Sequence, residues 1–363
     1  MVTNIYPTPD RPNMSPFVAR RVAALRQRGV EVIVAGPTSY RRNSIVRHIG
    51  IAWRALTARG RFDGVEAHPV YVAGVIGLVA ARLRRIPMVA YAHGGDVADY
   101  AMRNRLHGRL ARWVVRGADA IVANSADTAG YVARLGATAR VISPGLDLTL
   151  FRPESGDAPA PGAAPTAAPG AAPSDPRATR EALRARVGAG DDDLLALYVG
   201  MLSERKGADI FAAGLEMAAD RWRGAMVGEG QLASAIAAGH PSVALLPPVP
   251  PAEVAAWMRA ADAVVVPSRR EPLGLAAVEA LACGTAVVAS NTGGLQEVVH
   301  DSENGLLIPP ADAVALAVAL GRLADPRLRN RLAAAGPASV AAHDIMAAAA
   351  QMAEVWATLG VRA

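Results

Sequence analysis

Short apolar runs alternate along the chain with longer stretches in which apolar residues recur at helical spacing. The run at 263–266, Ala-Val-Val-Val, is short and β-branched, which is typical of a strand buried on both faces of a sheet. A second apolar strand is expected at 286–289, and the segment 275–282 between the two predicts a helix. A strand, a helix and a second strand in this order indicate a parallel α/β sheet.

The first part of the chain shows the same alternation. Residues 17–28 predict a helix with Val18 and Val22 on one face, preceded by Ser15 as its N-cap and Pro16 as its first residue. Further elements are expected as strands at 1–5, 30–35, 88–91 and 120–124 and as a helix at 70–84. Because the first strand is so short, we expect a few more residues upstream.

The composition changes sharply at 154–176, where Ala, Pro and Gly leave almost no large apolar residue. Such a segment cannot bury a core, so it predicts a mobile linker or a surface insertion. Beyond it, the strand expected at 194–199 begins a second α/β series. At 363 residues, two domains are the natural expectation. We therefore predict an N-terminal Rossmann-like domain at 1–152, the linker at 153–176, a C-terminal Rossmann-like domain at 177–343 and a terminal helix at 344–363.

The charge is spread unevenly over these domains. Residues 1–150 hold 21 arginines, no lysine and nine acidic residues, a net charge of +12. The whole chain carries +6, so the remainder carries −6. A basic first half and an acidic second half suggest that the first half meets an anionic partner.

Two predicted helices concentrate this positive charge. Near Arg41, Arg42 and Arg47 the apolar residues recur at helical spacing: Ile45, Ile49, Trp53 and Leu56. This helix either docks on an anionic membrane or, as an ordinary amphipathic helix, packs on the sheet; the second interpretation is favoured. Another helix carries a second basic run, Arg103, Arg105, Arg109, Arg112 and Arg116. No recognised nucleic-acid-binding module accompanies it, so we expect no nucleic-acid partner.

The cysteine content and the apolar runs bear on the compartment. The single cysteine, Cys283, cannot form an internal disulfide, which fits a reducing compartment, and it is expected to be a buried packing residue. No secretory signal is visible, and the most apolar run, 70–83, is too short to span a bilayer. We therefore expect a soluble cytoplasmic protein, with a peripheral position at the inner membrane face left open.

Two carboxylates mark the segment after the strand at 263–266. Glu271 lies in the loop beyond the strand end, where open α/β sheets bind ligands, and Glu279 lies on the following helix. Gly274 allows a ligand to approach the backbone closely, and the helix N-terminus favours an anion. Carboxylates accept hydrogen bonds from hydroxyl groups. This combination suits a phosphorylated polyhydroxyl ligand, although a surface Glu and a solvated helix Glu would look the same in isolation.

The stretch at 267–297 reads PSRREPLGLAAVEALACGTAVVASNTGGLQE. It closely resembles the E-x7-E region of family 4, the large family of retaining nucleotide-sugar glycosyltransferases with the GT-B fold. That pattern runs P-S-x-x-E-P-x-G-L-x-x-x-E-A-x-A-x-G-x-x-V-V-A-S-x-x-G-G-x-x-E. The resemblance implies two Rossmann-like domains facing across a central cleft, with the terminal helix crossing back onto the first.

Two further segments resemble motifs of the same family, and the first loop departs from the family's pattern. In Ala-His-Gly-Gly-Asp, the resemblance implies that His93 lies beside the donor sugar and that Gly94 and Asp96 lie on the acceptor side. The first loop of the family often contains glycines near both substrates; here Ser15 and its neighbours stand instead, and Ser15 is assigned to the acceptor side.

The segment GMLSERKG at 200–207 resembles the family's G-R-L-x-x-x-K-G. Met201 replaces the family's arginine, so one phosphate contact is missing unless Arg205 supplies it. A lysine is a point charge suited to a diphosphate. The resemblance implies a set of donor-binding residues that comprises Gly200, Arg205, Lys206, Gly207, Pro272, Leu273, Gly274, Leu275 and Glu279.

The resemblance implies transfer of a sugar from a nucleotide-sugar donor, with a UDP-sugar favoured, and with retention of anomeric configuration. Glu271 would hold sugar hydroxyls, Glu279 ribose hydroxyls, and Lys206 and Arg205 the leaving diphosphate. No metal-ligand cluster is visible, and no metal or other cofactor is expected.

Several alternatives stay open at this point. The same fold could support a nucleotide-sugar epimerase or hydrolase, and the Met201 departure makes a non-catalytic binding protein conceivable. The acceptor could be an anionic lipid, a phosphorylated compound, a polyol or a small natural product.

Overall fold

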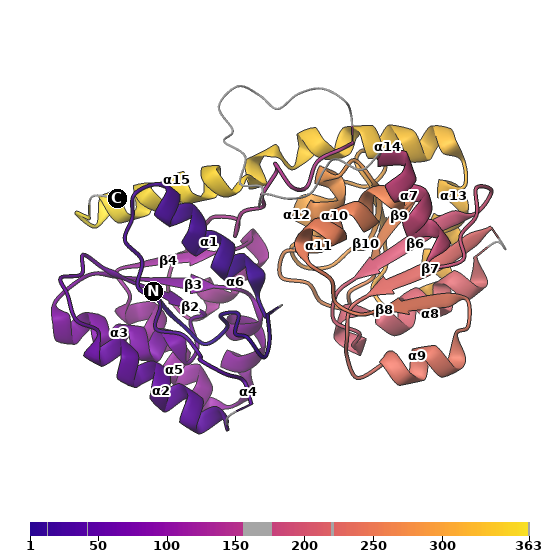
Figure 1. The fold of residues 1–363 in the computed structure, drawn as a ribbon. Helices are drawn as coiled ribbons and strands as arrows, with labels where there is room; N and C mark the ends of the chain where they lie inside the picture. The colour runs from indigo at the N-terminus through magenta and orange to yellow at the C-terminus, as the bar shows by residue number, and fades with distance from the viewer. Residues whose placement is uncertain (13, 42, 155–175, 219–220, 362–363) are drawn as a thin grey trace. The chain divides into compact units, whose positions relative to one another are not determined.

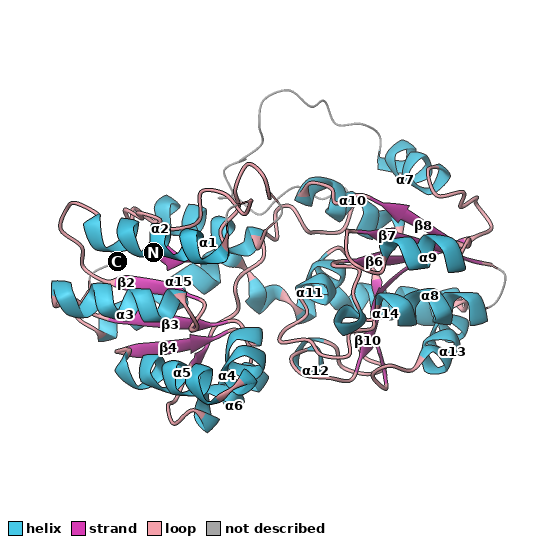
Figure 2. Cartoon of the chain, turned by 90° about the horizontal axis from the view of Figure 1, so that it is seen from below, coloured by secondary structure: helices cyan, strands magenta, loops and turns pink. Residues whose placement is uncertain are grey.

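The computed structural model describes residues 1–12, 14–41, 43–154, 176–218 and 221–361. The chain forms two compact units, unit 1 (Met1–Gly145 and His343–Ala363) and unit 2 (Leu146–Ala342) (Figures 1 and 2). Unit 1 ends before the predicted boundary at 152, because Leu146 and Phe151 are buried in the core of unit 2. The predicted linker at 153–176 lies almost entirely outside the described residues.

Unit 1 is built on a parallel sheet in the spatial order β1-β2-β3-β4-β5. Its strands are β1 (Val2–Thr3), β2 (Val65–His68), β3 (Met88–Ala92), β4 (Ala120–Ala123) and β5 (Arg140–Val141). Its helices are α1 (Pro16–Gln27), α2 (Ser44–Thr57), α3 (Ala73–Arg84), α4 (Ala101–Arg103), α5 (Arg105–Gly117), α6 (Ala126–Arg134) and α15 (Ile345–Thr358), with a π-helical turn, η1, at Asp96–Tyr100.

The prediction of a strand at 30–35 is wrong. Only Ala35 of this segment pairs with β1, in a single parallel bridge to Val2. Ala35 exchanges backbone hydrogen bonds with Met1 and Thr3, so the extended segment has few partners along its length. The bridge nevertheless places residue 35 beside β1, on the side away from β2. β1 therefore lies between residue 35 and β2.

Helices cover both faces of the unit 1 sheet (Figure 1). Buried residues of α2, α3 and α5 pack with Ala67, Met88 and Ala90 from one face. The C-terminal helix α15 packs with Val89 and Tyr91 from the other face, where it also contacts α1. Alternate residues of β3 therefore point to opposite cores, as the two-residue period of a strand requires.

Unit 2 has a six-stranded parallel sheet in the order β11-β10-β9-β6-β7-β8. The strands are β6 (Leu194–Val199), β7 (Trp222–Val227), β8 (Val243–Leu246), β9 (Ala263–Val266), β10 (Ala286–Ser290) and β11 (Leu306–Ile308). The helices are α7 (Pro176–Ala185), α8 (Ala208–Met217), α9 (Ala233–Gly239), α10 (Pro251–Ala260), α11 (Leu275–Ala282), α12 (Leu295–Val298), α13 (Ala313–Leu323) and α14 (Pro326–Ser339). Short 3₁₀ turns lie at Glu204–Lys206 (η2) and Ala341–His343 (η3).

The strand order of unit 2 is that of a doubly wound sheet. The chain enters at β6, moves outward through β7 and β8, and then returns to β9 on the other side of β6. Two apolar cores result, one under α10 and α11 and one under α8 and α13. The loops after β6 and β9 diverge to opposite faces, and such a switch point is where open α/β sheets bind ligands.

We predict that Gly64→Ala destabilises unit 1 by about 1–3 kcal/mol through overpacking. A Cβ added at Gly64 would lie 2.4 Å from the ring of Trp356, which holds α15 on the sheet. Chemical denaturation followed by circular dichroism measures the loss.

Gly130→Ala is the matched control. Gly130 lies in α6 with open space around it, so an added methyl group should be neutral or stabilising by up to about 1 kcal/mol. Equal effects of the two substitutions would show that Trp356 does not pack tightly against residue 64.

Candidate functional site

The predicted residues Lys206 and Glu271 meet at the switch point of unit 2. Lys206 Nζ donates to Glu271 Oε2 over 2.6 Å, although the two residues are 65 positions apart. The hydroxyl of Ser268 donates to the same carboxylate oxygen over 3.1 Å. Glu271 is 7 % exposed, so the ion pair lies at a largely covered edge of the sheet. A buried carboxylate held in this way has one lysine and one hydroxyl as fixed donors.

The strand ends and a bidentate ion pair position these two loops. Lys206 follows β6 and Glu271 follows β9, and the two strands are hydrogen-bonded neighbours in the sheet. Arg269 links the loops further, since both of its terminal nitrogens donate to Asp209 over 2.6–2.7 Å. The Arg269 guanidinium lowers the pKa of the Asp209 carboxyl, which stays ionised as the partner of this clamp.

Glycines allow the loop backbones to cross closely. A Cβ at Gly207 would lie 1.9 Å from the carbonyl oxygen of Pro267, and one at Gly228 would lie 1.9 Å from that of Gly200. Gly207 also has φ 70°, a left-handed conformation that suits glycine. The predicted residues Gly200 and Gly207 therefore serve backbone packing at the mouth of the sheet, which brings Lys206 to the β9 loop.

The segment 271–275 forms the entrance of helix α11. Pro272 and Leu273 turn the chain, and Gly274 has φ 90° directly before Leu275, the first helical residue. A Cβ at Gly274 would lie 2.3 Å from Leu295, so the position is closed to larger residues. Glu279 lies half-buried on this helix. The predicted helix at 275–282 is confirmed, while the use of Glu271 and Glu279 as an E-x7-E pair stays a prediction.

Met201 and Arg205 lie at the surface of the same edge. The Met201 side chain is 59 % exposed, so it leaves the position of the family's arginine open to solvent. Arg205 is also exposed, and its Nη1 donates to the carbonyl of Arg270 over 3.5 Å. Arg205 thus lies beside the Glu271 loop, where it is placed to add a second cation next to Lys206.

In unit 1, His93 and Asp96 come together at the end of β3. Asp96 accepts hydrogen bonds from the backbone N–H groups of His93, over 2.9 Å, and Val70, over 2.8 Å. Gly94 has φ 95° and makes the turn between them. The loop after β3 is therefore fixed to the loop after β2 by one buried carboxylate.

Burial dominates the electrostatics of Asp96. It raises the pKa of Asp96 to about 6, although the backbone donors of Val70 and His93 favour the charged form. The carboxyl thus titrates near neutrality instead of near its ordinary value of 3.8. The charge of this buried carboxyl therefore changes as the pH passes through about 6.

His93, a predicted site residue, ends a chain of polar side chains. Its ring contacts His68, which contacts Glu66, which is paired with Arg21. The other members of this chain were not predicted from the sequence. Glu66 and His68 lie on β2 two positions apart and so on the same face. A signal existed in the sequence: polar and apolar residues alternate in Val-Glu-Ala-His at 65–68, which is the two-residue period of a strand.

Ser15 does not behave as the predicted side-chain cap of α1. It has φ 45° and ψ 58°, and its side chain makes no capping hydrogen bond. Pro16 begins the helix as predicted, and the ring of Phe17 packs at 5.1 Å from that of His93. Ser15 is therefore the N-cap residue by position, as predicted, but its left-handed backbone comes without the side-chain hydrogen bond that a serine cap usually makes.

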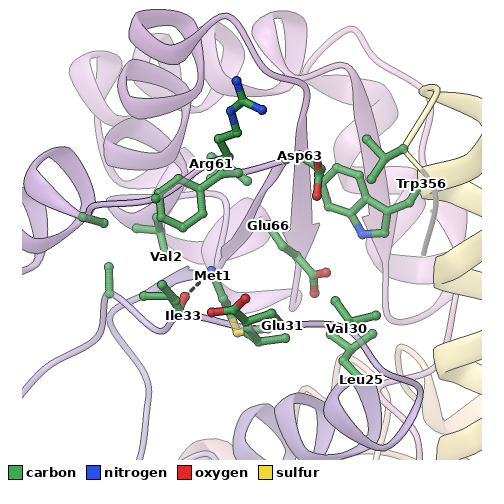
Figure 3. Close-up of a pocket in the computed structure, with 18 of the residues that line it drawn as sticks. Met1, Val2, Leu25, Val30, Glu31, Ile33, Arg61, Asp63, Glu66 and Trp356 are labelled. Carbon is green, nitrogen blue, oxygen red and sulfur yellow. Dashed lines mark hydrogen bonds between the residues drawn. The ribbon is translucent and has the colours of Figure 1, made fainter.

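A cavity of about 510 Å³ lies elsewhere in unit 1 (Figure 3). Met1, Ile33, Asp63 and Trp356 line it, around the starts of β1 and β2. Ligands of open α/β sheets bind at the carboxyl ends of strands, which is the opposite edge. The cavity therefore lies apart from His93 and Asp96, and only Glu66 of the polar chain reaches its wall.

Comparison with known proteins identifies the family. Residues 8–150 match the model described as Glycosyltransferase Family 4, and residues 193–325 match that of Glycosyl transferases group 1. A D-inositol 3-phosphate glycosyltransferase of Xylanimonas cellulosilytica is 35 % identical over 333 residues, which cover 83 % of this chain and 73 % of that protein. The chain belongs to glycosyltransferase family 4. A relative of the same description from Catenulispora acidiphila is 34 % identical, over 77 % of this chain and 68 % of its own.

Solved structures of known proteins share the fold of this chain. Sucrose-phosphate synthase from Thermosynechococcus elongatus has a TM-score of 0.75 at 25 % identity, covering 95 % of this chain and 93 % of its own. Anabaena Alr3699/HepE in complex with UDP-glucose has a TM-score of 0.71 at 21 % identity, covering 93 % and 88 %. The predicted fold class is confirmed as two parallel-sheet α/β domains of the GT-B type, and this family 4 chain is a glycosyltransferase.

We predict that Asp96 makes the stability of unit 1 depend on pH. Because its folded pKa is raised, its contribution is fully present below the unfolded value of 3.8 and is lost as pH rises through about 6. Relative to Asp96→Asn, the wild type should lose about 2 kcal/mol between pH 4 and pH 7. Denaturant titrations of both proteins at the two pH values measure the difference; a constant difference would contradict the assigned titration.

Proposed function

We propose that this glycosyltransferase moves a sugar from a nucleotide-sugar donor to a hydroxyl acceptor, with retention of anomeric configuration. The meeting of Lys206, Glu271 and Ser268 at the unit 2 switch point carries the proposal. A diphosphate placed there gains the lysine as a counter-charge, and a carboxylate next to it accepts hydrogen bonds from sugar hydroxyls. Glu279, further along α11, would hold the ribose hydroxyls.

In this proposal, the side-chain cations Lys206 and Arg205 do what a metal ion would otherwise do at the diphosphate. The departing diphosphate develops negative charge, which Lys206, Arg205 and the backbone amides at Gly274 and Leu275 would stabilise. Ion pairing with Glu271 keeps the Lys206 ammonium in place before the donor arrives. The reaction would then require no metal or other cofactor. Because Met201 replaces the family's arginine, one charged contact to the diphosphate is missing, and Arg205 would supply it.

We favour a UDP-sugar as the donor and a phosphorylated polyol as the acceptor. The structurally similar HepE has been observed with UDP-glucose, and two relatives that are 35 % identical are named D-inositol 3-phosphate glycosyltransferases. A phosphorylated acceptor also suits the net charge of +12 in residues 1–150.

The reaction would form and break bonds on one face of the sugar. The bond from the anomeric carbon to the donor phosphate breaks, and a bond to the acceptor oxygen forms. A leaving phosphate oxygen takes the proton of the acceptor hydroxyl, so no dedicated base is needed. His93 would contact the sugar, and Asp96 with Gly94 and Ser15 would serve the acceptor side.

We also propose that unit 1 contacts an anionic membrane through α2, which suits a cytoplasmic enzyme at the inner membrane face. Five exposed apolar residues lie on one face of this helix, within about one third of its circumference. They are Ile45, Val46, Ile49, Trp53 and Leu56. Trp53 is 69 % exposed and Ile45 67 %, so neither packs on the sheet. A wide apolar stripe with tryptophan is typical of helices that lie in a membrane interface.

The neighbouring helices add charge complementarity. The helices α2, α3 and α5 contact one another in sequence and contain eight arginines and no acidic residue. No helix of the described residues is long and apolar enough to cross a membrane. An anionic leaflet is the partner that satisfies both the apolar stripe and the positive face.

The first test of the proposed function is product formation from UDP-sugars with inositol phosphate as the acceptor. Lys206→Ala and Glu271→Ala should each lower kcat/KM at least roughly tenfold, because each removes a group that contacts the donor. Arg223→Ala removes only a surface pair with Asp193 and should leave the rate unchanged. Free sugar or an epimer without acceptor would indicate a hydrolase or epimerase, and donor binding without any product would indicate a binding protein.

The membrane proposal predicts binding to vesicles of phosphatidylglycerol and not to those of phosphatidylcholine, with binding weakened by salt. The double variant Ile49→Ser, Trp53→Ser should lose most of the sedimented fraction. The matched control is Val314→Ser, Val318→Ser, an equally exposed apolar pair on α13 of unit 2. Equal sedimentation of both variants, or none of the wild type, would reject α2 as a docking surface.

A further inference from the structure

A continuous chain of hydrogen bonds runs beneath one face of the unit 1 sheet. Arg21 Nε donates to Glu66 Oε1 over 2.6 Å, and the same oxygen lies 2.6 Å from His68 Nε2. His68 Nδ1 in turn lies 2.9 Å from His93 Nε2. Arg21, Glu66 and His68 are buried, while His93, at the strand end, is half-buried. The chain therefore connects a covered ion pair to the one member that a substrate can reach.

The donors and acceptors of this chain fix where each proton lies. Glu66 is ionised, since Arg21 and His68 hold its pKa well below the usual range despite its burial. A carboxylate only accepts, so His68 Nε2 carries a proton. Burial lowers the pKa of His68, which is therefore neutral and has a bare Nδ1. That nitrogen accepts the proton of His93 Nε2.

His93 is then left with a bare Nδ1. Burial, with His68 and Arg21 as further causes, lowers the pKa of His93 well below its ordinary value, so the ring is neutral. Within the described part of the chain, no hydrogen bond reaches its Nδ1. Its backbone N–H donates to Asp96, and its carbonyl accepts from the Asn124 side chain. The free lone pair is an acceptor for a hydroxyl group.

Aromatic packing holds the two imidazole rings in this orientation. Tyr91 stacks on His68 at 4.8 Å and on His93 at 4.8 Å. The Arg21 guanidinium lies 5.1 Å above the Tyr91 ring, and the Tyr91 hydroxyl donates to the carbonyl of Ile142. The ring of Phe17 also packs 5.1 Å from that of His93, so both imidazoles are held by neighbouring rings.

We propose that Glu66 and His68 are positioning residues that hold His93 neutral, protonated at Nε2 and bare at Nδ1, so that Nδ1 accepts a hydrogen bond from a substrate hydroxyl. The inference rests on the proposed function for the role of His93 in sugar transfer. The assignment of the protons rests on the structure of unit 1 alone.

A neutral His93 suits the chemistry of glycosyl transfer. The sugar becomes oxocarbenium-like and carries positive charge as the donor bond breaks. An imidazolium beside it would repel this charge, whereas a lone pair on Nδ1 orients a hydroxyl without adding a positive charge. The Arg21–Glu66 pair keeps the net charge of the chain at zero as long as both histidines remain neutral.

The decisive experiment is long-range ¹H–¹⁵N correlation NMR of the full-length protein with labelled histidine. The His93 signals are assigned from the spectrum of His93→Gln. We expect a protonated Nε2 and a bare Nδ1 in the wild type, with the pKa of His93 below its ordinary value of 6.5. A proton on Nδ1 of His93 in the wild type would overturn the proposal, and the variant serves only to assign the signals.

Two substitutions at His68 separate positioning from packing. His68→Phe keeps the ring that stacks on Tyr91 but removes the acceptor, so the His93 signals should shift to a mixture of tautomers. His68→Asn places an amide oxygen near the position of Nδ1 and should restore the wild-type tautomer. An unchanged tautomer in a folded His68→Phe protein would show that His68 does not set the protonation of His93.

Kinetics then connect the tautomer to turnover. We expect kcat to fall roughly tenfold in His68→Phe, with a smaller change in KM, and to recover in His68→Asn. If the wild type shows the expected tautomer but transfers no sugar, the proposed function fails and the proton assignment stands. If the wild type is active and His68→Phe retains its full kcat despite a changed tautomer, the positioning role in catalysis is rejected.

Discussion

The arrangement of the loops at the carboxyl edge of the unit 2 sheet depends on glycines, which let one backbone cross another without an intervening side chain. Gly207 lies against the carbonyl of Pro267, and Gly294 lies against that of Pro272; an added Cβ would come within 2.2 Å in both cases. The first crossing joins the loop after β6 to the end of β9, and the second joins the loops after β9 and β10. The ion pair between Lys206 and Glu271 forms where the first two meet. The chemistry of the site is therefore a consequence of loop packing as much as of the charged residues themselves.

Both units use the same general solution with different side chains. Parallel strands end at one edge of each sheet, and the polar residues that follow them collect there. In unit 2 the result is a cation, a carboxylate and a helix entrance, which suit a diphosphate and a sugar. In unit 1 it is a pair of neutral imidazoles and the carboxyl of Asp96, which suit hydroxyl groups. The division matches the needs of a glycosyltransferase, whose leaving group is anionic and whose acceptor reacts through a hydroxyl.

Sequence reasoning succeeded where the signal is local or the motif is long. The apolar run of β9, the helix α11 and the polar residues between them are all visible in one continuous stretch. The polar chain in unit 1 was missed because Arg21 and Glu66 lie 45 positions apart, and each alone resembles an ordinary charged residue of a helix or strand. The segment 30–35 has the composition of a strand, but pairing depends on the partner beside it, which composition does not report.

Binding of a nucleoside diphosphate to unit 2 tests the central claim most directly. In a thermal-shift titration of the full chain with UDP, GDP, TDP and their sugars, one nucleotide family should stabilise the protein. Saturation at a hundredfold the dissociation constant adds about 2.7 kcal/mol, which raises Tm by several degrees. The account predicts that this shift disappears in Lys206→Ala. A protein that no nucleotide or nucleotide sugar stabilises would contradict the donor site at Lys206 and Glu271.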